Sequence, residues 1–207
     1  MSESISRADT DDLAQSQHDH ADERTGKQRN RLVLLLGVIA ALSLALDLIT
    51  KAWAWHALRD GQIVRIIPRF LHFDFGFNTG AAFGLLREHD WARGLFIVVT
   101  MVALAYIVQL ARTLPTTSPW GFVALGFIVG GTLGNLLDRL FRTMDVGGRT
   151  LHGVVDFIVV FYWPGHRWPA FNVADAALVV GVVVFLLYLR KHGDPVHVAP
   201  ALHGPPA

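Results

Sequence analysis

The stretch AFNVADAALVVGVVVFLLYLR (residues 170–190) decides the architecture of this chain. The second part of this stretch is apolar over nearly the length needed to cross a bilayer. A helix that spans a bilayer needs roughly 20 mostly apolar residues. The first part of the stretch places an amide, Asn172, and a carboxylate, Asp175, where that helix begins. Ionisable groups near membrane depth are costly and mark functional sites. The position of every other polar residue relative to the apolar runs therefore matters.

Three further runs have the same character, so the predicted spans are Leu32–Trp53, Trp91–Ala111, Trp120–Leu140 and Ala174–Leu189. Core helices of a soluble protein would show a polar face. Residues 95–110, however, carry only Thr100 and Gln109 as clearly polar side chains. A cleaved signal peptide would not follow a long polar leader and precede three more spans. The third span has a glycine at every fourth residue from Gly126 to Gly134, which is typical of a close packing seam. We predict four retained transmembrane helices.

The composition agrees with a membrane protein that has polar ends. Apolar residues make up 52% and charged residues 17%, against roughly 25% charged in soluble domains. Residues 1–30 and 192–207 are predicted to be disordered tails around a membrane domain over 31–191. The chain has no cysteine, which excludes disulfides, zinc–thiolate sites and thiol nucleophiles. No basic stripe with interleaved aromatics and no histidine spacing for a metal occur, so we expect no nucleic-acid partner and no histidine metal site.

Four spans place both termini on one side of the membrane. Basic residues flank the first and last spans on that side, and such residues favour the cytoplasm: Arg24, Lys27, Arg29, Arg31, Arg190 and Lys191. The total Lys and Arg content does not separate the two sides, so the predicted cytoplasmic location of the termini depends on these flanks.

The polar residues converge on the side opposite the termini, whichever way the bundle is inserted. They lie at the exits of the first and third spans, in both connections on that side and at the entrance of the fourth span: Asp47, Lys51, Asn78, Asn135, Asp138, Arg139, Asp156, Asn172 and Asp175. Counting spans thus predicts one polar site at that membrane surface.

Several of these residues also have a purely structural interpretation. Asp47 and Lys51 are four apart with the acid first, which suits an ion pair on a helix. Asn135 and Asp138 share a helix face, whereas Arg139 points about 100° away. A substrate or another carboxylate is therefore a plausible partner for Arg139.

Asp156 is harder to explain structurally, because it lies in the apolar run GVVDFIVVFYW (153–163). The topology offers Asp175 and Arg139 as its partners. Asp175 by itself suits a helix N-terminus, where the macrodipole favours acids. Two close carboxylates in a partly desolvated pocket cannot both ionise cheaply, so one holds a proton. Such a pair can activate water and protonate a leaving group, and we predict that Asp156 and Asp175 carry the chemistry.

Five motifs occur in order along the chain: DLITK (47–51), FNTGAAFG (77–84), GGTLGNLLDRL (130–140), VVDFI (154–158) and FNVADAAL (171–178). With these motifs the chain from about Arg31 to Arg190 resembles bacterial lipoprotein signal peptidase (signal peptidase II), an intramembrane aspartic protease. The resemblance implies an all-α membrane protein with four transmembrane helices and a small periplasmic β-cradle in the first extramembrane connection. Residues 63–78, rich in Ile, Val and Phe, would supply the cradle, although Pro68 limits its strands.

The resemblance also implies the reaction and the residues that perform it. The enzyme would cut prolipoproteins just before a diacylglyceryl-modified cysteine, without cofactor or metal, at the periplasmic face of the bacterial inner membrane. The catalytic pair falls on Asp156 and Asp175. Substrate-binding residues fall on Asn78, Asn135, Arg139 and Asn172. Supporting residues fall on Asp47, Lys51, Gly80 and Asp138, with Asp138 expected to hold Arg139 or the helix end. Membrane lipid is the other expected partner, and the chain is expected to be monomeric.

The alternative from another class is a small proton-coupled transporter, for which acids in the membrane are equally expected. A transporter would carry polar groups through the middle of its spans, often with repeats or broken helices. The centres of these spans are apolar and no repeat is visible. A scaffold held by the glycine seam would leave Asp156 and Asp175 unexplained.

Overall fold

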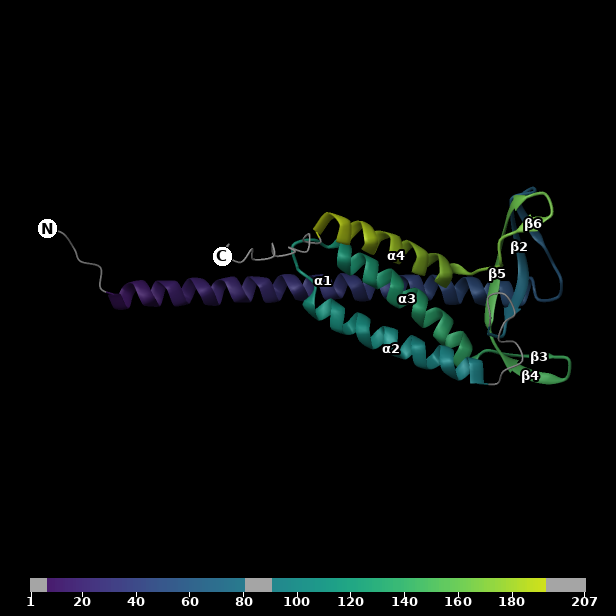
Figure 1. The fold of residues 1–207 in the computed structure, drawn as a ribbon, viewed down its shortest axis with the longest axis horizontal. Helices are drawn as coiled ribbons and strands as arrows, with labels where there is room; N and C mark the ends of the chain where they lie inside the picture. Colours follow the sequence, from purple (N-terminus) through teal and green to yellow (C-terminus); the bar gives the residue numbers. More distant parts are fainter. Residues whose placement is uncertain (1–6, 81–90, 193–207) are drawn as a thin grey trace, which may run out of the picture.

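The computed structural model describes residues 7–80 and 91–192, so residues 81–84 of the FNTGAAFG motif and most of the predicted C-terminal tail lie outside it. Within these residues four long helices form a bundle, and antiparallel strands lie at one end of it (Figure 1). Each helix contains a stretch long and apolar enough to cross a membrane, as predicted. The helices are α1 (Arg7–Ala57), α2 (Trp91–Thr113), α3 (Trp120–Phe141) and α4 (Val173–His192).

Helix α1 begins at Arg7, well before its apolar run, so residues 7–30 are helical where composition predicts disorder. An exposed i,i+4 ion pair between Glu23 and Lys27, 2.6 Å long, supports the helix there. Arg29 donates to the carbonyl oxygen of Arg112 at 2.7 Å, one of the C-terminal carbonyls of α2 that lack a partner within their own helix. The polar leader therefore continues the first span as helix, and part of it contacts the end of α2.

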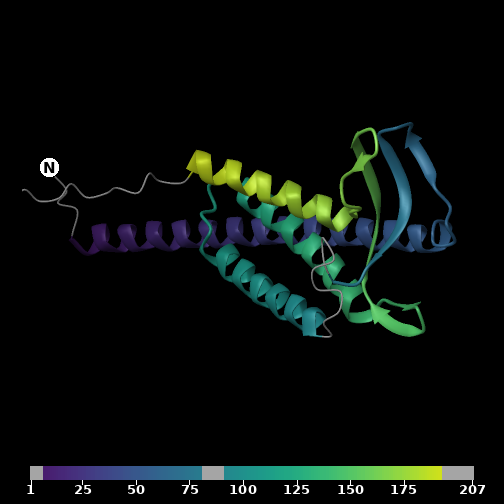
Figure 2. The ribbon, with the colours of Figure 1, turned by 45° about the vertical axis from the view of Figure 1, so that its right-hand side comes forward.

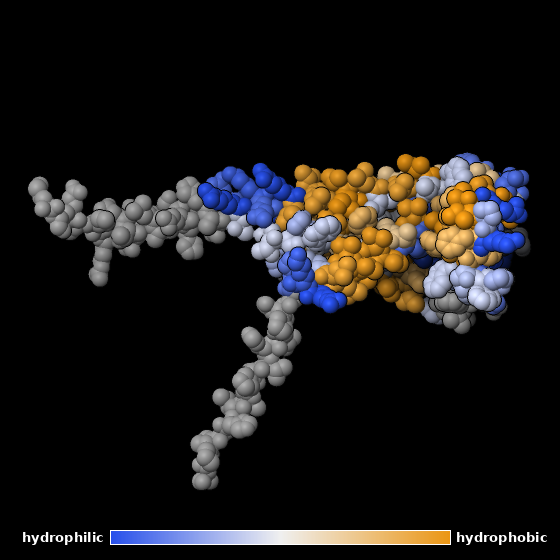
Figure 3. All heavy atoms as spheres, turned by 90° about the horizontal axis from the view of Figure 1, so that it is seen from above, coloured by the Kyte–Doolittle hydropathy of each residue, from blue (hydrophilic) through white to orange (hydrophobic). Residues whose placement is uncertain are grey.

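Helix α3 lies at the centre of the bundle. In its most apolar window 56% of the residues are buried, against 11% to 17% for the other three helices. Those helices present large apolar side chains outward. On the face seen in Figure 3 these side chains form a broad hydrophobic band across the bundle. Such a band is stable only against lipid or another apolar surface. The bundle is that of a multi-span membrane protein.

The glycines of α3 bring it against α1, which confirms the predicted packing seam. A Cβ on Gly130 would lie 2.6 Å from the carbonyl oxygen of Ala40 and from Cβ of Ser43. A Cβ on Gly134 would meet the carboxylate of Asp47. Small residues here allow the backbones to approach closely, and they bring Asp47 beside α3.

The strands form one four-stranded antiparallel sheet and a separate hairpin (Figure 2). The sheet has the order β1 (Val64–Ile67), β2 (Leu71–Asn78), β5 (Val154–Trp163) and β6 (His166–Arg167), and the hairpin pairs β3 (Thr143–Val146) with β4 (Arg149–His152). Residues 63–78 supply two strands, as predicted. The second connection adds β5 and β6 to this sheet, which the sequence analysis does not predict. The apolar run around Asp156 is extended, and it pairs with β2 and β6 through backbone hydrogen bonds.

The sheet is fixed to the end of α1 by a small core. Ala54 of α1 and Leu58, the residue after this helix, are fully buried against Val155 and Phe157 of β5. Trp53 meets the ring of Phe157 edge to face, with centroids 6.0 Å apart. This packing holds β5 against the ends of the spans, where the polar residues lie.

Candidate active site

Asp156 is positioned by the pairing of β5 with β2. Its register partner is Gly76, and Val154 pairs with Asn78. A Cβ on Gly76 would lie 3.1 Å from the carbonyl oxygen of Asp156, so the absence of a side chain there lets the strands approach. The Asp156 residue is 6% exposed.

The chain between β6 and α4 returns along β5 before α4 begins. The N–H of Ile158 donates to the oxygen of Phe171 at 2.8 Å, and the N–H of Phe171 donates back to Ile158 at 3.1 Å. The next residue, Asn172, therefore lies beside Asp156, and α4 starts one residue later. This return brings Asp175, in the first turn of α4, to the same place as Asp156.

Asn172 connects the two carboxylates. Its side-chain amide donates to Oδ1 of Asp156 at 2.7 Å, while its backbone N–H donates to Oδ2 of Asp175 at 3.1 Å. The N–H of Asp175 returns a hydrogen bond to Oδ1 of Asn172 at 3.0 Å. This reciprocal pattern is a capping box with Asp in place of Glu. The interpretation of Asp175 as a helix N-terminal acid thus describes its geometry correctly, and it does not exclude a chemical role.

Asn135 of α3 and Asn78 of β2 complete the hydrogen bonding of the pair. Asn135 donates to Oδ1 of Asp175 at 2.8 Å, and Asn78 donates to Oδ2 of Asp156 at 3.0 Å. All four carboxylate oxygens therefore accept a hydrogen bond from an uncharged amide or backbone N–H. Such donors position the two acids without neutralising them as a cation would.

Gly80 supports Asn78. Its N–H donates to Oδ1 of Asn78 at 3.2 Å, and its φ is 144°. Only glycine adopts this backbone conformation readily. The conformation of residue 80 therefore helps to orient the Asn78 amide toward Asp156.

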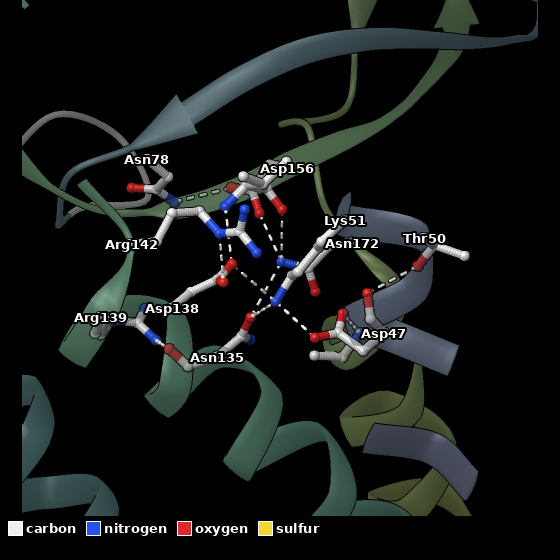
Figure 4. A network of polar contacts seen from close by, with 12 residues as sticks. Asp47, Thr50, Lys51, Asn78, Asn135, Asp138, Arg139, Arg142, Asp156 and Asn172 are labelled. Carbon is white, nitrogen blue, oxygen red and sulfur yellow. Dashed lines mark hydrogen bonds and ion pairs between the residues drawn. The ribbon is translucent and has the colours of Figure 1, made fainter. Parts of the chain in front are cut away.

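A charged cluster lies next to Asp156 (Figure 4). The predicted Asp47–Lys51 ion pair is present at 2.8 Å, and Lys51 also lies 3.3 Å from Asp138. Lys51 and Asp47 are fully buried. The ammonium group of Lys51 also donates to Oδ1 of Asn135 at 2.9 Å. Lys51 therefore fixes the amide that in turn reaches Asp175.

The two acids of this cluster hold the backbone beside each member of the pair. Oδ1 of Asp47 accepts the N–H of Ala174 at 2.9 Å, immediately before Asp175. Oδ2 of Asp138 accepts the N–H of Val155 at 3.2 Å, immediately before Asp156. The cluster thus connects α1 and α3 to both chain segments that carry the pair.

Asp138 pairs with Arg142 rather than with Arg139. Nε of Arg142 lies 2.7 Å from Oδ1 of Asp138, and its guanidinium group lies over the ring of Trp55. Arg142 is the C-cap of α3, so Asp138 contacts the end of its own helix. Among the described residues, no ion pair joins Asp138 to Arg139. Sequence reasoning missed Arg142, although its i,i+4 spacing from Asp138 was a usable signal.

Arg139 lies on a different side of α3, as its helical angle predicts. Its guanidinium carbon lies 5.1 Å from the ring centroid of Phe96, and Nη1 donates to the carbonyl oxygen of Asn135 at 3.3 Å. No carboxylate pairs with it within residues 7–80 and 91–192. Arg93 of α2 donates to the carbonyl oxygens of Arg139 at 2.9 Å and Leu140 at 3.3 Å. Sequence reasoning missed Arg93, because no local pattern predicts a contact between separate spans.

The environment of Asp156 suits proton transfer. Its burial and the nearby charge of Asp175 raise the pKa of Asp156 from 3.8 to about 6, against the opposing effect of the hydrogen bonds from Asn78 and Asn172. A carboxyl group with a pKa near the working pH can both accept and donate a proton at low cost. The arrangement can therefore perform general acid–base chemistry on a bound water.

Comparisons with known proteins indicate the family of this chain. The family model described as "Signal peptidase (SPase) II" matches residues 39–191. A lipoprotein signal peptidase of Pseudomonas putida is 37% identical over 163 residues, covering 77% of this chain and 90% of that protein. One of Maridesulfovibrio salexigens is 35% identical over 164 residues, covering 76% and 96%. One of Geobacter metallireducens is 37% identical over 153 residues, covering 74% and 88%.

Solved structures share the fold. Two structures titled as bacterial membrane enzymes are each 29% identical to this chain, with TM-scores of 0.60 and 0.62. They align with 74% and 75% of this chain, and with 86% and 92% of their own. Because the family model covers most of the membrane domain and the relatives match over nearly their whole length, the chain belongs to the signal peptidase II family.

Proposed function

We propose that this peptidase cuts lipid-modified prolipoproteins just before the lipidated cysteine, with Asp156 and Asp175 as its acid–base pair. The observation that carries the proposal is the position of Asn172, which donates to both carboxylates. Curated relatives named lipoprotein signal peptidase support the substrate class. Family membership also implies a bacterial inner-membrane location.

The proposed mechanism uses one ionised and one protonated carboxyl group. The ionised group takes a proton from water, which attacks the scissile carbonyl carbon. The protonated group donates a hydrogen bond to the carbonyl oxygen, where negative charge develops. When the tetrahedral intermediate collapses, the pair passes a proton to the leaving amine, and the C–N bond breaks. The raised pKa of Asp156 supports such sharing of a proton.

The surrounding residues position this pair and the substrate. Asn78, Asn135 and Asn172 hold the carboxylates, and Gly80 orients Asn78. The Asp47–Lys51–Asp138 cluster keeps the adjacent backbone in place. Arg139 remains without a carboxylate partner among the described residues, which suits binding of a substrate carbonyl or lipid ester oxygen. All these groups come from one chain, which supports a monomeric enzyme.

We further propose that the sheet faces the periplasm and that both ends of the chain face the cytoplasm. The basic flanks of α1 and α4 support this orientation. The chain has no cysteine, so single cysteines at Gln62, beside the sheet, and Thr117, between α2 and α3, can be labelled in intact cells. An impermeant thiol reagent should label Gln62→Cys and spare Thr117→Cys. The reverse pattern would refute the orientation.

The function is tested with purified protein in detergent and a fluorescent prolipoprotein peptide, with and without a diacylglyceryl cysteine. Cleavage of only the lipidated peptide, immediately before the cysteine, is expected. Cleavage of both peptides at equal rates would contradict the substrate class. The transporter alternative requires proton flux through vesicles that contain the protein, without peptide cleavage.

A further inference from the structure

The far end of the sheet carries exposed side chains that the peptidase site does not use. This end, which we call the tip, consists of residues 65–70 in the β1–β2 hairpin and residues 161–168 in the β5–β6 hairpin. Tyr162 and Trp163 are 62% and 68% exposed, and large apolar neighbours are also exposed: Ile66, Ile67, Phe70 and Trp168. An edge strand with exposed apolar residues is a liability in water. We therefore expect the tip to lie against another surface that covers its apolar side chains.

A groove separates the two hairpins of the tip. It has a volume of about 720 Å³, comparable to the pockets of about 300–1,000 Å³ that hold small ligands. Arg65, Pro68, Arg69 and His72 line one side, and residues 161–165 line the other. The backbone N–H of Phe161 donates to the oxygen of Phe70 at 2.8 Å, which holds the hairpins together beside the groove.

Both arginines of the groove lack a counter-charge within the described part of the chain. The nearby acids are already engaged, since Asp60 lies 3.9 Å from Arg59 and Asp74 lies 3.9 Å from Arg167. Neither Arg65 nor Arg69 forms an ion pair with any described residue. The groove thus presents two guanidinium groups whose charge is available to an anionic ligand.

Arg69 is also held in an unfavourable backbone conformation. The N–H of Phe70 donates to the oxygen of Ile67 at 3.1 Å, which closes a turn around Pro68 and Arg69. Arg69 has φ of 64° at the position of a type II turn that normally takes glycine or asparagine. Residues in this left-handed region cost free energy and cluster at ligand-binding sites. An arginine here points to a role for its side chain in binding.

The position of the tip indicates what covers it. Figures 1 and 2 show the sheet at the end of the four spans, with the tip to the side of the N-terminal end of α4. That side of the bundle is lipid-facing, because outward residues of α4 such as Val179 and Val183 are exposed and apolar. Tyrosine and tryptophan are enriched where lipid meets water. Figure 3 shows hydrophobic and hydrophilic side chains mixed over this end of the molecule.

We propose that the tip rests on the bilayer surface and that its groove binds the phosphate of an anionic phospholipid through Arg65 and Arg69. Guanidinium groups bind phosphate oxygens in a planar, two-pronged geometry. The exposed Ile, Phe and Trp side chains would enter the region of the ester groups and upper acyl chains. An acidic peptide would match the charge but would leave these apolar side chains uncovered, so a lipid fits the surface better. This inference does not depend on the peptidase mechanism.

The test is native mass spectrometry of the full chain in detergent, titrated with phosphatidylglycerol or phosphatidylcholine. The paired variant Arg65→Gln/Arg69→Gln should bind phosphatidylglycerol about tenfold or more weakly than the unchanged protein, since each basic residue near anionic lipid contributes about fivefold. The matched control Arg59→Gln/Arg167→Gln removes the same charge from exposed positions that do not line the groove and should retain binding. Inorganic phosphate should not displace the lipid, because it supplies no apolar contact.

A second measurement locates the tip directly. A spin label on Ile67→Cys in vesicles containing phosphatidylglycerol should lie near the phosphate level, and the arginine pair variant should move it toward water. Cleavage of a short lipidated peptide in detergent should be unchanged in that variant. Equal phosphatidylglycerol binding by the arginine pair variant and its control would overturn the proposal, and so would a fully water-exposed label. An effect confined to substrates with an acidic segment after the cysteine would identify a peptide, not a lipid, as the occupant.

Discussion

Asn172 and Asp175 hydrogen-bond each other twice, from the N–H of Asn172 to the Asp175 carboxylate at 3.1 Å and from the N–H of Asp175 to the Asn172 amide oxygen at 3.0 Å. The same carboxylate that we assign to the chemistry therefore closes the first turn of α4. It cannot rotate away without breaking the cap of its own helix. A proposed catalytic group fixed in this way is preorganised before substrate binds.

Replacement of Asn172 separates capping from catalysis. Serine keeps an oxygen that can accept the N–H of Asp175, but it has no amide to donate to Asp156. Asn172→Ser should therefore reduce the cleavage rate by about 10²-fold or more. Asn172→Ala should lose the same activity and, in addition, about 1 kcal/mol of stability, because its side chain cannot cap the helix. Turnover measurements check the loss of activity, and thermal unfolding in detergent checks the loss of stability. Wild-type turnover in Asn172→Ser would show that its amide is dispensable.

Removal of the Lys51 charge should destabilise the protein. Lys51→Met leaves the buried Asp47 and Asp138 without that cation, and breaking a buried ion pair in this way costs about 3–5 kcal/mol. The matched control, Lys27→Met, breaks the exposed pair with Glu23 and should cost less than about 1 kcal/mol. Asp47→Asn should lower stability while keeping residual specific activity. Equal thermal shifts for Lys51→Met and Lys27→Met would contradict a supporting role for the cluster.

Span counting predicted that Asp156, Asn172 and Asp175 meet at one membrane surface, because helix polarity alone decides which ends are neighbours. It could not show that Phe171 pairs with Ile158, since that contact depends on the return of a loop along β5. The spacing of Asn172 and Asp175 is that of a capping box and was available in the sequence.

Side-chain partners across the bundle were harder to predict. The i,i+4 interval from Asp138 to Arg142 is typical of a helical ion pair, but Arg139, the next residue after Asp138, offers a second cation in the same sequence. The contact of Arg93 with the end of α3 joins two spans through backbone carbonyls, which carry no sequence signal. The strand character of residues 154–163 was hidden by an apolar run that does not alternate, because the first residues of β5 are buried on both faces.

Arg139→Lys should impair cleavage while the protein still inserts normally. Arginine stacks over Phe96 and donates to the carbonyl oxygen of Asn135. Lysine keeps the charge but has neither the planar group nor its several fixed donors. We expect turnover to fall by at least about tenfold at equal membrane abundance. Wild-type turnover would mean that Arg139 supplies charge alone.

The pKa of Asp156 predicts a specific effect of pH on stability. Its folded value of about 6 lies above the ordinary 3.8, so the folded protein binds this proton more tightly than the unfolded chain does. The resulting stabilisation is present below about pH 4 and is lost as pH rises to 6. The loss amounts to about 3 kcal/mol for a shift of this size.

Asp156→Asn cannot ionise at this position, so its unfolding free energy should fall less between pH 4 and pH 7 than that of the unchanged protein. Denaturant titrations in detergent at both pH values measure the difference. If the difference in unfolding free energy between Asp156→Asn and the unchanged protein stays constant from pH 4 to pH 7, Asp156 titrates normally in the folded state.

The most direct test of the two-carboxylate mechanism is single-turnover cleavage of lipidated substrate by folded, purified Asp156→Asn, Asp175→Asn and the double variant. Asparagine keeps the shape of aspartate, so folding should survive and a failure is chemical. Each single change should abolish cleavage, and the double change should cost little more, because residues that act as one unit are not additive. Asp156→Glu and Asp175→Glu should also be severely impaired, since a displacement of about 1 Å can cost 10²-fold. Near-normal turnover in either asparagine variant would contradict the mechanism and require another group to activate the water.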